Sequence, residues 1–315
     1  MKRARRLLLA ASTICLAASA QAQEFINVLT GGTSGVYYPL GVALSQVYGK
    51  AMPGAKTAVQ ATKASSENLN LLEAKRGEIA FTLGDALNEA WKGNEEAGFK
   101  APLKKLRTIA AIYPNYIQIV ANADSGIKTL ADLKGKRVAV GAPKSGTELN
   151  ARDILKGAGM SYKDFAKTEY LPFGESVELI KNRQLDATLI SAGLGVAAVR
   201  DLSTAMKIVV VPISADVVKK IGEAAYQSAV IPANTYTGQT TEVQTIAIQN
   251  FLVTHDGVSN DTAYKMTKAI FDSLPELHAA HAAAKAISKE NAAKAPPVPL
   301  HPGAEKYYKE AGLLK

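Results

Sequence analysis

Glycine and hydroxyl residues fill the junction between a predicted strand and a predicted helix near the start of the chain. Residues 25–30 suit a β-strand, residues 31–35 read Gly-Gly-Thr-Ser-Gly, and apolar residues then recur at helical spacing over residues 36–50. Glycines leave backbone N–H groups uncovered, Thr33 and Ser34 add hydroxyl donors, and the positive end of the helix dipole lies at the same place. The junction therefore suits a small anion, and it equally suits a plain strand-to-helix turn with a Ser/Thr cap.

Four further strand ends repeat this pattern. Predicted strands over residues 56–62, 78–83, 136–141 and 187–191 are each followed by Gly, Ser, Thr or Asn before a helix. Each is by itself an ordinary capping signal. Their repetition favours a shared role, in which several helix N-termini converge on one anionic ligand.

Strands and helices alternate along the rest of the chain, which predicts an α/β architecture with mainly parallel sheets. Further strands are predicted over residues 107–113, 116–121, 167–171, 207–212 and 245–253. Further helices are predicted over residues 65–76, 147–156, 176–182, 195–202, 215–222, 260–273, 275–284 and 303–311. No flexible linker separates two halves, so residues 113–121 and 245–253 are predicted to cross between two lobes that enclose a ligand cleft.

The first residues have the features of a secretory signal peptide. Four basic residues precede an apolar stretch that is too short for a good membrane span, and Ala20-Gln21-Ala22 matches an A-x-A cleavage site. We expect residues 1–22 to be removed and the mature chain to begin at Gln23 in a periplasm. The one cysteine, Cys15, lies inside this segment, so no disulfide is expected in the product.

Charge and motifs argue against several other functions. After the four basic residues of the leader are removed, the excess of positive charge is mild and spread along the chain, so nucleic acid is not an expected partner. Residues 193–198 fit G-x-G-x-x-A without a surrounding βαβ unit, and residues 141–147 have P-loop spacing with Thr147 in place of Lys. His278 and His281 share a helix face without a third ligand. We expect no catalytic residue, no metal and no cofactor.

Residues 31–41, Gly-Gly-Thr-Ser-Gly-Val-Tyr-Tyr-Pro-Leu-Gly, strongly resemble the TAXI family. These are the extracytoplasmic solute receptors of TRAP (tripartite ATP-independent periplasmic) transporters. The resemblance continues through residues 62–68, 130–138, 141–147 and 300–308 and covers essentially the whole mature chain. It implies a two-lobed type II periplasmic-binding-protein fold, whose ligand is delivered to membrane subunits driven by an ion gradient. Family ligands include glutamate, glutamine and small di- or oxocarboxylates.

Carried over residue by residue, the resemblance implies a site built from both lobes. The first lobe, residues 23–118 plus 247–315, would supply Gly32, Thr33, Ser34, Tyr37, Thr62, Ser65, Asn68 and Asp85. The second lobe, residues 119–246, would supply Ser145, Gly146, Thr147, Ser191 and Gly193. Asp85 could pair with an amino group of the ligand or cap the next helix. The chain departs from many relatives at Asn115 and Gln118, where an acid and a histidine are usual.

The predicted function is capture of a small carboxylate, with glutamate, glutamine or a related C4–C5 dicarboxylate as the first expectation, and delivery to TRAP membrane subunits. An exported hydrolase that uses an exposed serine, or a sensor of the same fold, is the alternative. None of the six arginines of the mature chain lies in the strand-end motifs, and Arg152 is nearest. Helix N-termini and the hydroxyls of Thr33, Ser34, Ser145 and Thr147 are therefore predicted to hold the carboxylate in place of an arginine clamp.

Overall fold

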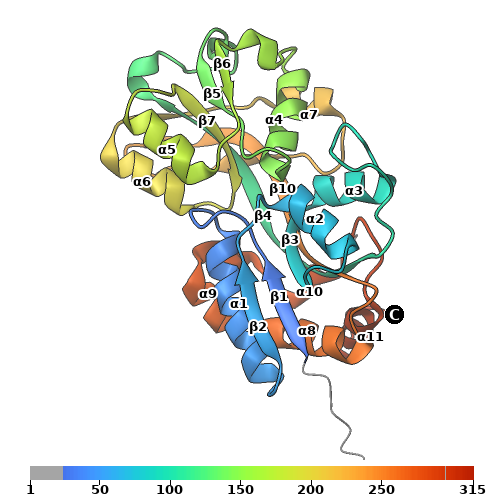
Figure 1. Cartoon of the computed structure of the whole chain (residues 1–315). Helices are drawn as coiled ribbons and strands as arrows, with labels where there is room; N and C mark the ends of the chain where they lie inside the picture. Colours follow the sequence, from blue (N-terminus) through green and yellow to red (C-terminus); the bar gives the residue numbers. More distant parts are fainter. Residues whose placement is uncertain (1–23, 295) are drawn as a thin grey trace, which may run out of the picture.

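Ten strands form one mixed sheet in the computed structural model, which describes residues 24–294 and 296–315 (Figure 1). Along the sheet the strands run in the order β2-β1-β3-β10-β4-β7-β5-β6, with β8 paired to β4 and β9 paired to β10. The strands are β1 (Phe25–Leu29), β2 (Lys56–Gln60), β3 (Ile79–Leu83), β4 (Leu106–Asn122), β5 (Arg137–Ala139), β6 (Lys167–Glu169), β7 (Ala187–Ala192), β8 (Ile208–Val211), β9 (Gln227–Ile231) and β10 (Val243–His255).

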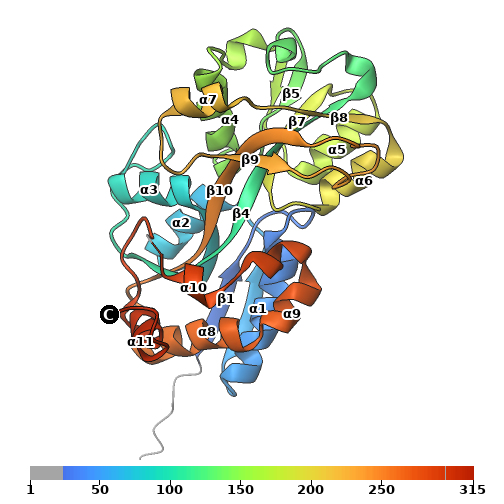
Figure 2. The same ribbon diagram turned by 180° about the vertical axis from the view of Figure 1, so that it is seen from behind.

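Helices flank this sheet in two groups (Figures 1 and 2). The group around β1–β3, called the first lobe here, holds α1 (Tyr37–Ala51), α2 (Ser65–Glu73), α3 (Gly84–Lys92), α8 (Asn260–Asp272), α9 (Leu274–Ala280), α10 (Lys289–Ala292) and α11 (Pro302–Glu310). The group around β5–β9, called the second lobe, holds α4 (Gly146–Gly157), α5 (Phe173–Lys181), α6 (Ala197–Ala205) and α7 (Ala215–Ile221). Short 3-10 turns connect several of these elements.

Parallel pairing sets the direction of the strands within each lobe. In the first lobe β1 pairs in parallel with β2 and β3, and in the second lobe β5 pairs in parallel with β6 and β7. Every residue of β3 and β7 is buried, as expected for strands covered by helices on both faces. The carboxyl ends of the parallel strands in both lobes point to the space between the lobes, where ligands of α/β sheets bind.

Two long antiparallel strands, β4 and β10, run from one lobe into the other (Figure 2). The sequence predicted a break in β4, because residues 107–113 and 116–121 are separated by Pro114. The break prediction was wrong: Pro114 lies in register with Gln249, beside an irregularity of β10 between Gln249 and Phe251. A proline, which has no N–H to donate, is tolerated at such an irregularity.

The predicted α/β architecture is confirmed, and the structure corrects it in two places. Helix α3 was not predicted: it starts directly after β3 with no loop, so Gly84 and Asp85, which were interpreted as the residues that follow the strand, are its first residues. Strand β9 was not predicted, because three of its five residues are exposed, and among the described strands it pairs with β10 alone. The exact lobe boundaries, 23–118 plus 247–315 and 119–246, stay a prediction.

The predicted signal peptide, residues 1–22, lies outside the described residues. Among the helices of residues 24–294 and 296–315, none combines the length and the apolar character that a membrane crossing requires.

Candidate functional site

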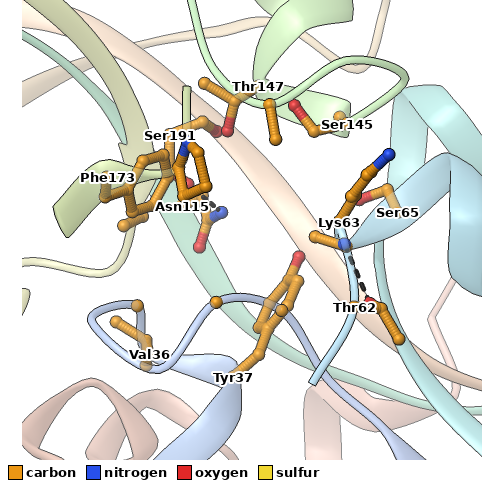
Figure 3. Close-up of a pocket in the computed structure, with 18 of the residues that line it drawn as sticks. Val36, Tyr37, Thr62, Lys63, Ser65, Asn115, Ser145, Thr147, Phe173 and Ser191 are labelled. Carbon is orange, nitrogen blue, oxygen red and sulfur yellow. Dashed lines mark hydrogen bonds between the residues drawn. The ribbon is translucent and has the colours of Figure 1, made fainter. Parts of the chain in front are cut away.

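An open cleft with about 700 Å³ of empty space, solvent at its mouth included, lies where the two lobes meet (Figure 3). Its lining comes from the ends of strands in both lobes and from β4. The lining residues are Gly31, Gly32, Ser34, Gly35, Val36, Tyr37, Thr62, Lys63, Ala64, Ser65, Leu83, Asn115, Ala142, Ser145, Gly146, Thr147, Pro172, Phe173, Ser191 and Ala192.

The glycine-rich turn after β1 forms the floor of this cleft. The N–H of Gly35 donates to the carbonyl of Gly32 at 3.0 Å, which closes the turn just before α1. Tyr37 stacks on Phe81 with ring centroids 4.9 Å apart and donates its hydroxyl to Asn250 of β10. Burial raises the pKa of Tyr37 well above its ordinary value, so the phenol stays neutral.

The segment after β2 forms a second wall and carries a cation. The Thr62 hydroxyl accepts from the N–H of Ala64 at 2.9 Å, and the Ser65 hydroxyl accepts from the N–H of Leu83 at 3.1 Å. Ala64 adopts φ 69° and ψ −142°, a region that non-glycine residues rarely occupy. Lys63 is exposed, its side chain extends along the cleft, and it forms no ion pair with another described residue.

The opposite wall is the start of α4. Ser145 caps this helix, since its hydroxyl accepts from the N–H of Glu148 at 3.1 Å, and its own hydrogen stays available to a ligand. Gly141 has φ +96°, and a Cβ there would lie 2.8 Å from Thr147. A side chain at Gly146 would collide with Ser65, so the starts of α4 and α2 meet across the cleft.

The remaining wall combines an apolar surface with two polar groups. Pro172 and Phe173 begin α5, and Figure 3 shows Phe173 across the cleft from Lys63. Asn115 of β4 donates to the carbonyl of Ser191 at 2.9 Å and accepts from Asn250 at 2.7 Å, which fixes its amide. The Ser191 hydroxyl is buried and has no hydrogen-bond partner among the described residues. An unpartnered buried hydroxyl on a cleft wall suits a ligand that would bond to it.

Four helices, α1, α2, α4 and α5, begin at this cleft. Each start contributes free N–H groups and a partial positive charge. Lys63 adds a full charge, and neither a carboxylate nor an arginine lines the cleft within the described residues. The electrostatics therefore favour an anion.

The structure brings nine of the predicted site residues to the cleft: Gly32, Ser34, Tyr37, Thr62, Ser65, Ser145, Gly146, Thr147 and Ser191. Their binding roles stay a prediction. Four others do not line it. Thr33 is exposed outside the lining, and Gly193 is buried, where a Cβ would lie 2.7 Å from Ala283. Asn68 donates to the carbonyls of Thr30 and Phe81 at 2.7 and 2.8 Å and so joins the ends of β1 and β3.

Asp85 also turns away from the cleft. Its carboxyl group accepts from Asn150 of α4 at 2.6 Å and lies 3.0 Å from the hydroxyl of Tyr226. It is therefore not placed to pair with an amino group of a ligand in the cleft. Arg152 is also engaged elsewhere: it pairs with Glu148 at 2.8 Å and donates to the carbonyl of Glu96.

Several lining residues were missed by sequence reasoning. Lys63 stands among the polar residues after β2, where a lone lysine is indistinguishable from a solvated one. Asn115 was noted only as a departure from relatives. Pro172 and Phe173 were assigned to no element, because they fall between the strand predicted over residues 167–171 and the helix predicted over residues 176–182.

A serine–histidine pair of the kind that many hydrolases use does not line this cleft within the described residues. The four histidines, His255, His278, His281 and His301, are not among the lining residues, so no imidazole is placed beside a cleft serine. His281 instead caps a 3-10 turn by accepting from the N–H of Ala283 at 3.1 Å. Over the described part of the chain, no group of His, Cys, Asp and Glu side chains is arranged to hold a metal ion.

Comparison with known proteins identifies the family and the fold. The family model for the NMT1-like family matches residues 28–312. One similar solved structure, described as a periplasmic transporter, aligns with a TM-score of 0.59 at 13% identity over 93% of this chain and 94% of that one. A protein from Bordetella bronchiseptica RB50 gives a TM-score of 0.54 at 16% identity over 92% and 82%.

A third structure, a binding-protein component of an ABC phosphonate transporter from Pseudomonas aeruginosa, gives a TM-score of 0.53 at 14% identity over 84% and 80%. These likenesses confirm the two-lobed solute-binding-protein fold. The resemblance to TAXI receptors stays a prediction.

Proposed function

The chain belongs to the NMT1-like family, and we propose that it is a periplasmic receptor that binds a small organic anion and presents it to the membrane subunits of a transporter. The observation that carries this proposal is the meeting of four helix N-termini and Lys63 at one cleft between two lobes. A helix N-terminus with free N–H groups is a general anion site.

The anionic group of the ligand is proposed to bind between the starts of α2 and α4. Lys63, Ser65 and Ser145 lie on this side of the cleft (Figure 3). Lysine supplies charge, and backbone N–H groups and hydroxyls supply directed hydrogen bonds. A carboxylate, a sulfonate or a phosphonate would satisfy this set of donors.

The rest of the ligand is proposed to be largely apolar and without an ammonium group. Val36, Leu83, Pro172 and Phe173 offer an apolar surface of the kind that surrounds bound ligands. An ammonium group would need a carboxylate, and Asp85 is engaged by Asn150 and Tyr226. Glutamate, glutamine and C4–C5 dicarboxylates remain ligands to test, with monoanions that carry an apolar body as the proposed better class.

Two kinds of transporter are candidates for the membrane partner, a TRAP transporter and an ABC transporter. The sequence resemblance implies TRAP membrane subunits, whereas the binding protein from Pseudomonas aeruginosa that shares this fold is described as part of an ABC transporter. We keep the TRAP partner as the proposal from the sequence. Membrane vesicles that contain either kind of permease, supplied with receptor and labelled ligand, would distinguish the two.

A thermal-shift screen tests the ligand class. The set should contain monocarboxylates with apolar bodies, dicarboxylates, amino acids, alkanesulfonates and alkylphosphonates at matched ionic strength. A ligand present at 100 times its Kd adds about 2.7 kcal/mol to the free energy of unfolding. We expect anions to raise the Tm and neutral analogues of the same shape to leave it unchanged. A screen in which only cations or neutral solutes stabilise the protein would overturn the proposal.

A further inference from the structure

A buried chain of polar side chains joins the two lobes beside the cleft, apart from the groups assigned to the anion. Asp85, in the first turn of α3, accepts from the side-chain amide of Asn150 at 2.6 Å and contacts the Tyr226 hydroxyl at 3.0 Å. The same hydroxyl lies 2.7 Å from a carboxylate oxygen of Asp153. Asp85 lies on α3 of the first lobe, Asn150 and Asp153 lie on α4 of the second lobe, and Tyr226 directly precedes β9 of the second lobe. Figure 1 shows α3 and α4 on neighbouring parts of the two lobes.

The hydroxyl and amide hydrogens of these four side chains cannot satisfy every contact among them if both carboxylates are ionised. The Tyr226 hydroxyl has one hydrogen, yet it lies within hydrogen-bond distance of both Asp85 and Asp153. With both carboxylates ionised, one of the two contacts would bring lone pairs together without a hydrogen. One added proton removes this conflict, because the amide of Asn150 then donates to Asp85, protonated Asp85 donates to Tyr226, and Tyr226 donates to ionised Asp153.

Burial places the added proton on Asp85. Asp85 is 3% exposed and its second carboxylate oxygen has no partner among the described residues, whereas Asp153 is only partly buried. Loss of water around a carboxyl disfavours its charged form. Burial accordingly raises the pKa of Asp85 to about 7, and burial also raises the pKa of Asp153.

The charged side chains that act on Asp85 are negative. The negative charges of Asp153 and Glu223 disfavour ionisation of Asp85 and so raise its pKa further. Arg152 and Lys156 of α4 lower the pKa of Asp153 and Glu89 of α3 raises it, while burial remains the largest cause of its upward shift. Arg152 also pairs with Glu148, and Lys92 pairs with Glu89 at 3.1 Å.

We propose that Asp85 is a positioning residue whose protonated carboxyl joins α3 to α4 through Asn150, Tyr226 and Asp153 and thereby holds the two lobes together. Separation of α3 from α4 would expose Asp85 to water and return it to an ordinary aspartate. Between the pKa values of Asp85 in the two arrangements, the closed arrangement therefore binds up to one proton more than the open arrangement. This inference concerns the movement of the lobes and does not depend on which solute the cleft binds.

The sign of the pH effect follows from linkage. The pKa of Asp85 is about 7 in the closed arrangement and near the ordinary value of about 4 when solvated. The closed-to-open ratio is therefore highest below about pH 4, falls by at most about tenfold per pH unit as the pH rises, and levels off above about pH 7.

Distance measurement between fluorophores on the two lobes tests the proposal without a ligand. Labels would be attached at Lys50→Cys on α1 and Lys163→Cys in the second lobe, both exposed positions, in the full chain that carries Cys15→Ser. Single-molecule energy transfer recorded from pH 4.5 to 8 should show the closed population of the wild type decreasing and then levelling off near pH 7.

Two variants distinguish an effect of the proton on Asp85 from an effect of side-chain packing on the closed population. Asp85→Asn imitates the protonated acid, and rotation of the Asn150 amide would present its unpartnered oxygen to the new side chain. We expect its closed population to stay high and independent of pH. Asp153→Asn removes the negative charge that raises the pKa of Asp85, so the pH at which the closed population levels off should be lower than in the wild type. Asp216→Asn, on the exposed surface of α7, is the control and should follow the wild type. A wild-type population that does not change with pH, or an identical pH profile in Asp85→Asn, would overturn the proposal.

Discussion

Gly146 and Ser65 approach each other across the cleft so closely that a Cβ on Gly146 would lie 2.6 Å from the Ser65 hydroxyl. The same Cβ would lie 2.8 Å from Leu83. Gly146 begins α4 of the second lobe, and Ser65 begins α2 of the first. The absence of a side chain at Gly146 therefore allows two helix N-termini to meet at the site proposed for the anion.

Substitution Gly146→Ala should weaken ligand binding by at least about tenfold, because a clash of this size costs more than about 1.4 kcal/mol unless the lobes separate. Titration calorimetry with an anion selected by the screen measures the effect. Gly49→Ala is the matched control, since a Cβ there meets nothing closer than 3.8 Å. Unchanged affinity in Gly146→Ala would show that the two helix starts do not need this contact to bind the ligand.

Substitution Lys63→Met removes the one cation that lines the cleft within the described part of the chain, while it keeps the length of the side chain. Affinity for the anion should fall by about 10- to 100-fold, the scale of a charge-assisted hydrogen bond of 1.5–3 kcal/mol. The dependence of the Kd on salt should also become shallower. Lys128→Met, at an exposed position outside the cleft, should leave both quantities unchanged.

The sequence could predict the cleft because its main feature is local. Each strand end with Gly, Ser or Thr specifies a helix start by capping and turn chemistry alone, as the cap of Ser145 on Glu148 illustrates. Parallel pairing then brings the starts to one edge of the sheet. Local chemistry and the order of elements thus accounted for most of the predicted residues that line the cleft.

Residues that depend on distant partners could not be predicted. Asp85 offered two local interpretations, and its partner Tyr226 lies 141 residues away in the chain. Lys63 carries no local signal that separates a cleft lysine from a solvated one. Phe173 was missed because α5 starts three residues before the helix predicted at Ser176.

Hydroxyl donors should matter more than arginine in this cleft. Ser34→Ala and Thr147→Val should each weaken anion binding by about 1–3 kcal/mol, the range for hydrogen bonds to a charged group. Thr147→Ser should restore most of the loss, because it keeps the hydroxyl. Arg152→Ala should have little effect on affinity, since its guanidinium is held by Glu148 and Glu96. Loss of binding in Arg152→Ala alone, measured by calorimetry, would point to an arginine clamp instead.

Two buried tyrosines of α1 should respond in opposite ways to the same substitution. The hydroxyl of Tyr37 donates to Asn250, a residue that is 0% exposed and also donates to Asn115. Tyr37→Phe leaves the Asn250 oxygen without that donor and should reduce the free energy of unfolding by about 1–3 kcal/mol. The hydroxyl of Tyr48 is also buried and has no partner among the described residues, so Tyr48→Phe removes an unsatisfied group and should leave stability unchanged or increase it. Urea denaturation of both variants at one pH measures the difference. Equal destabilisation by the two substitutions would mean that lost packing, and not the hydrogen bond to Asn250, determines the role of Tyr37.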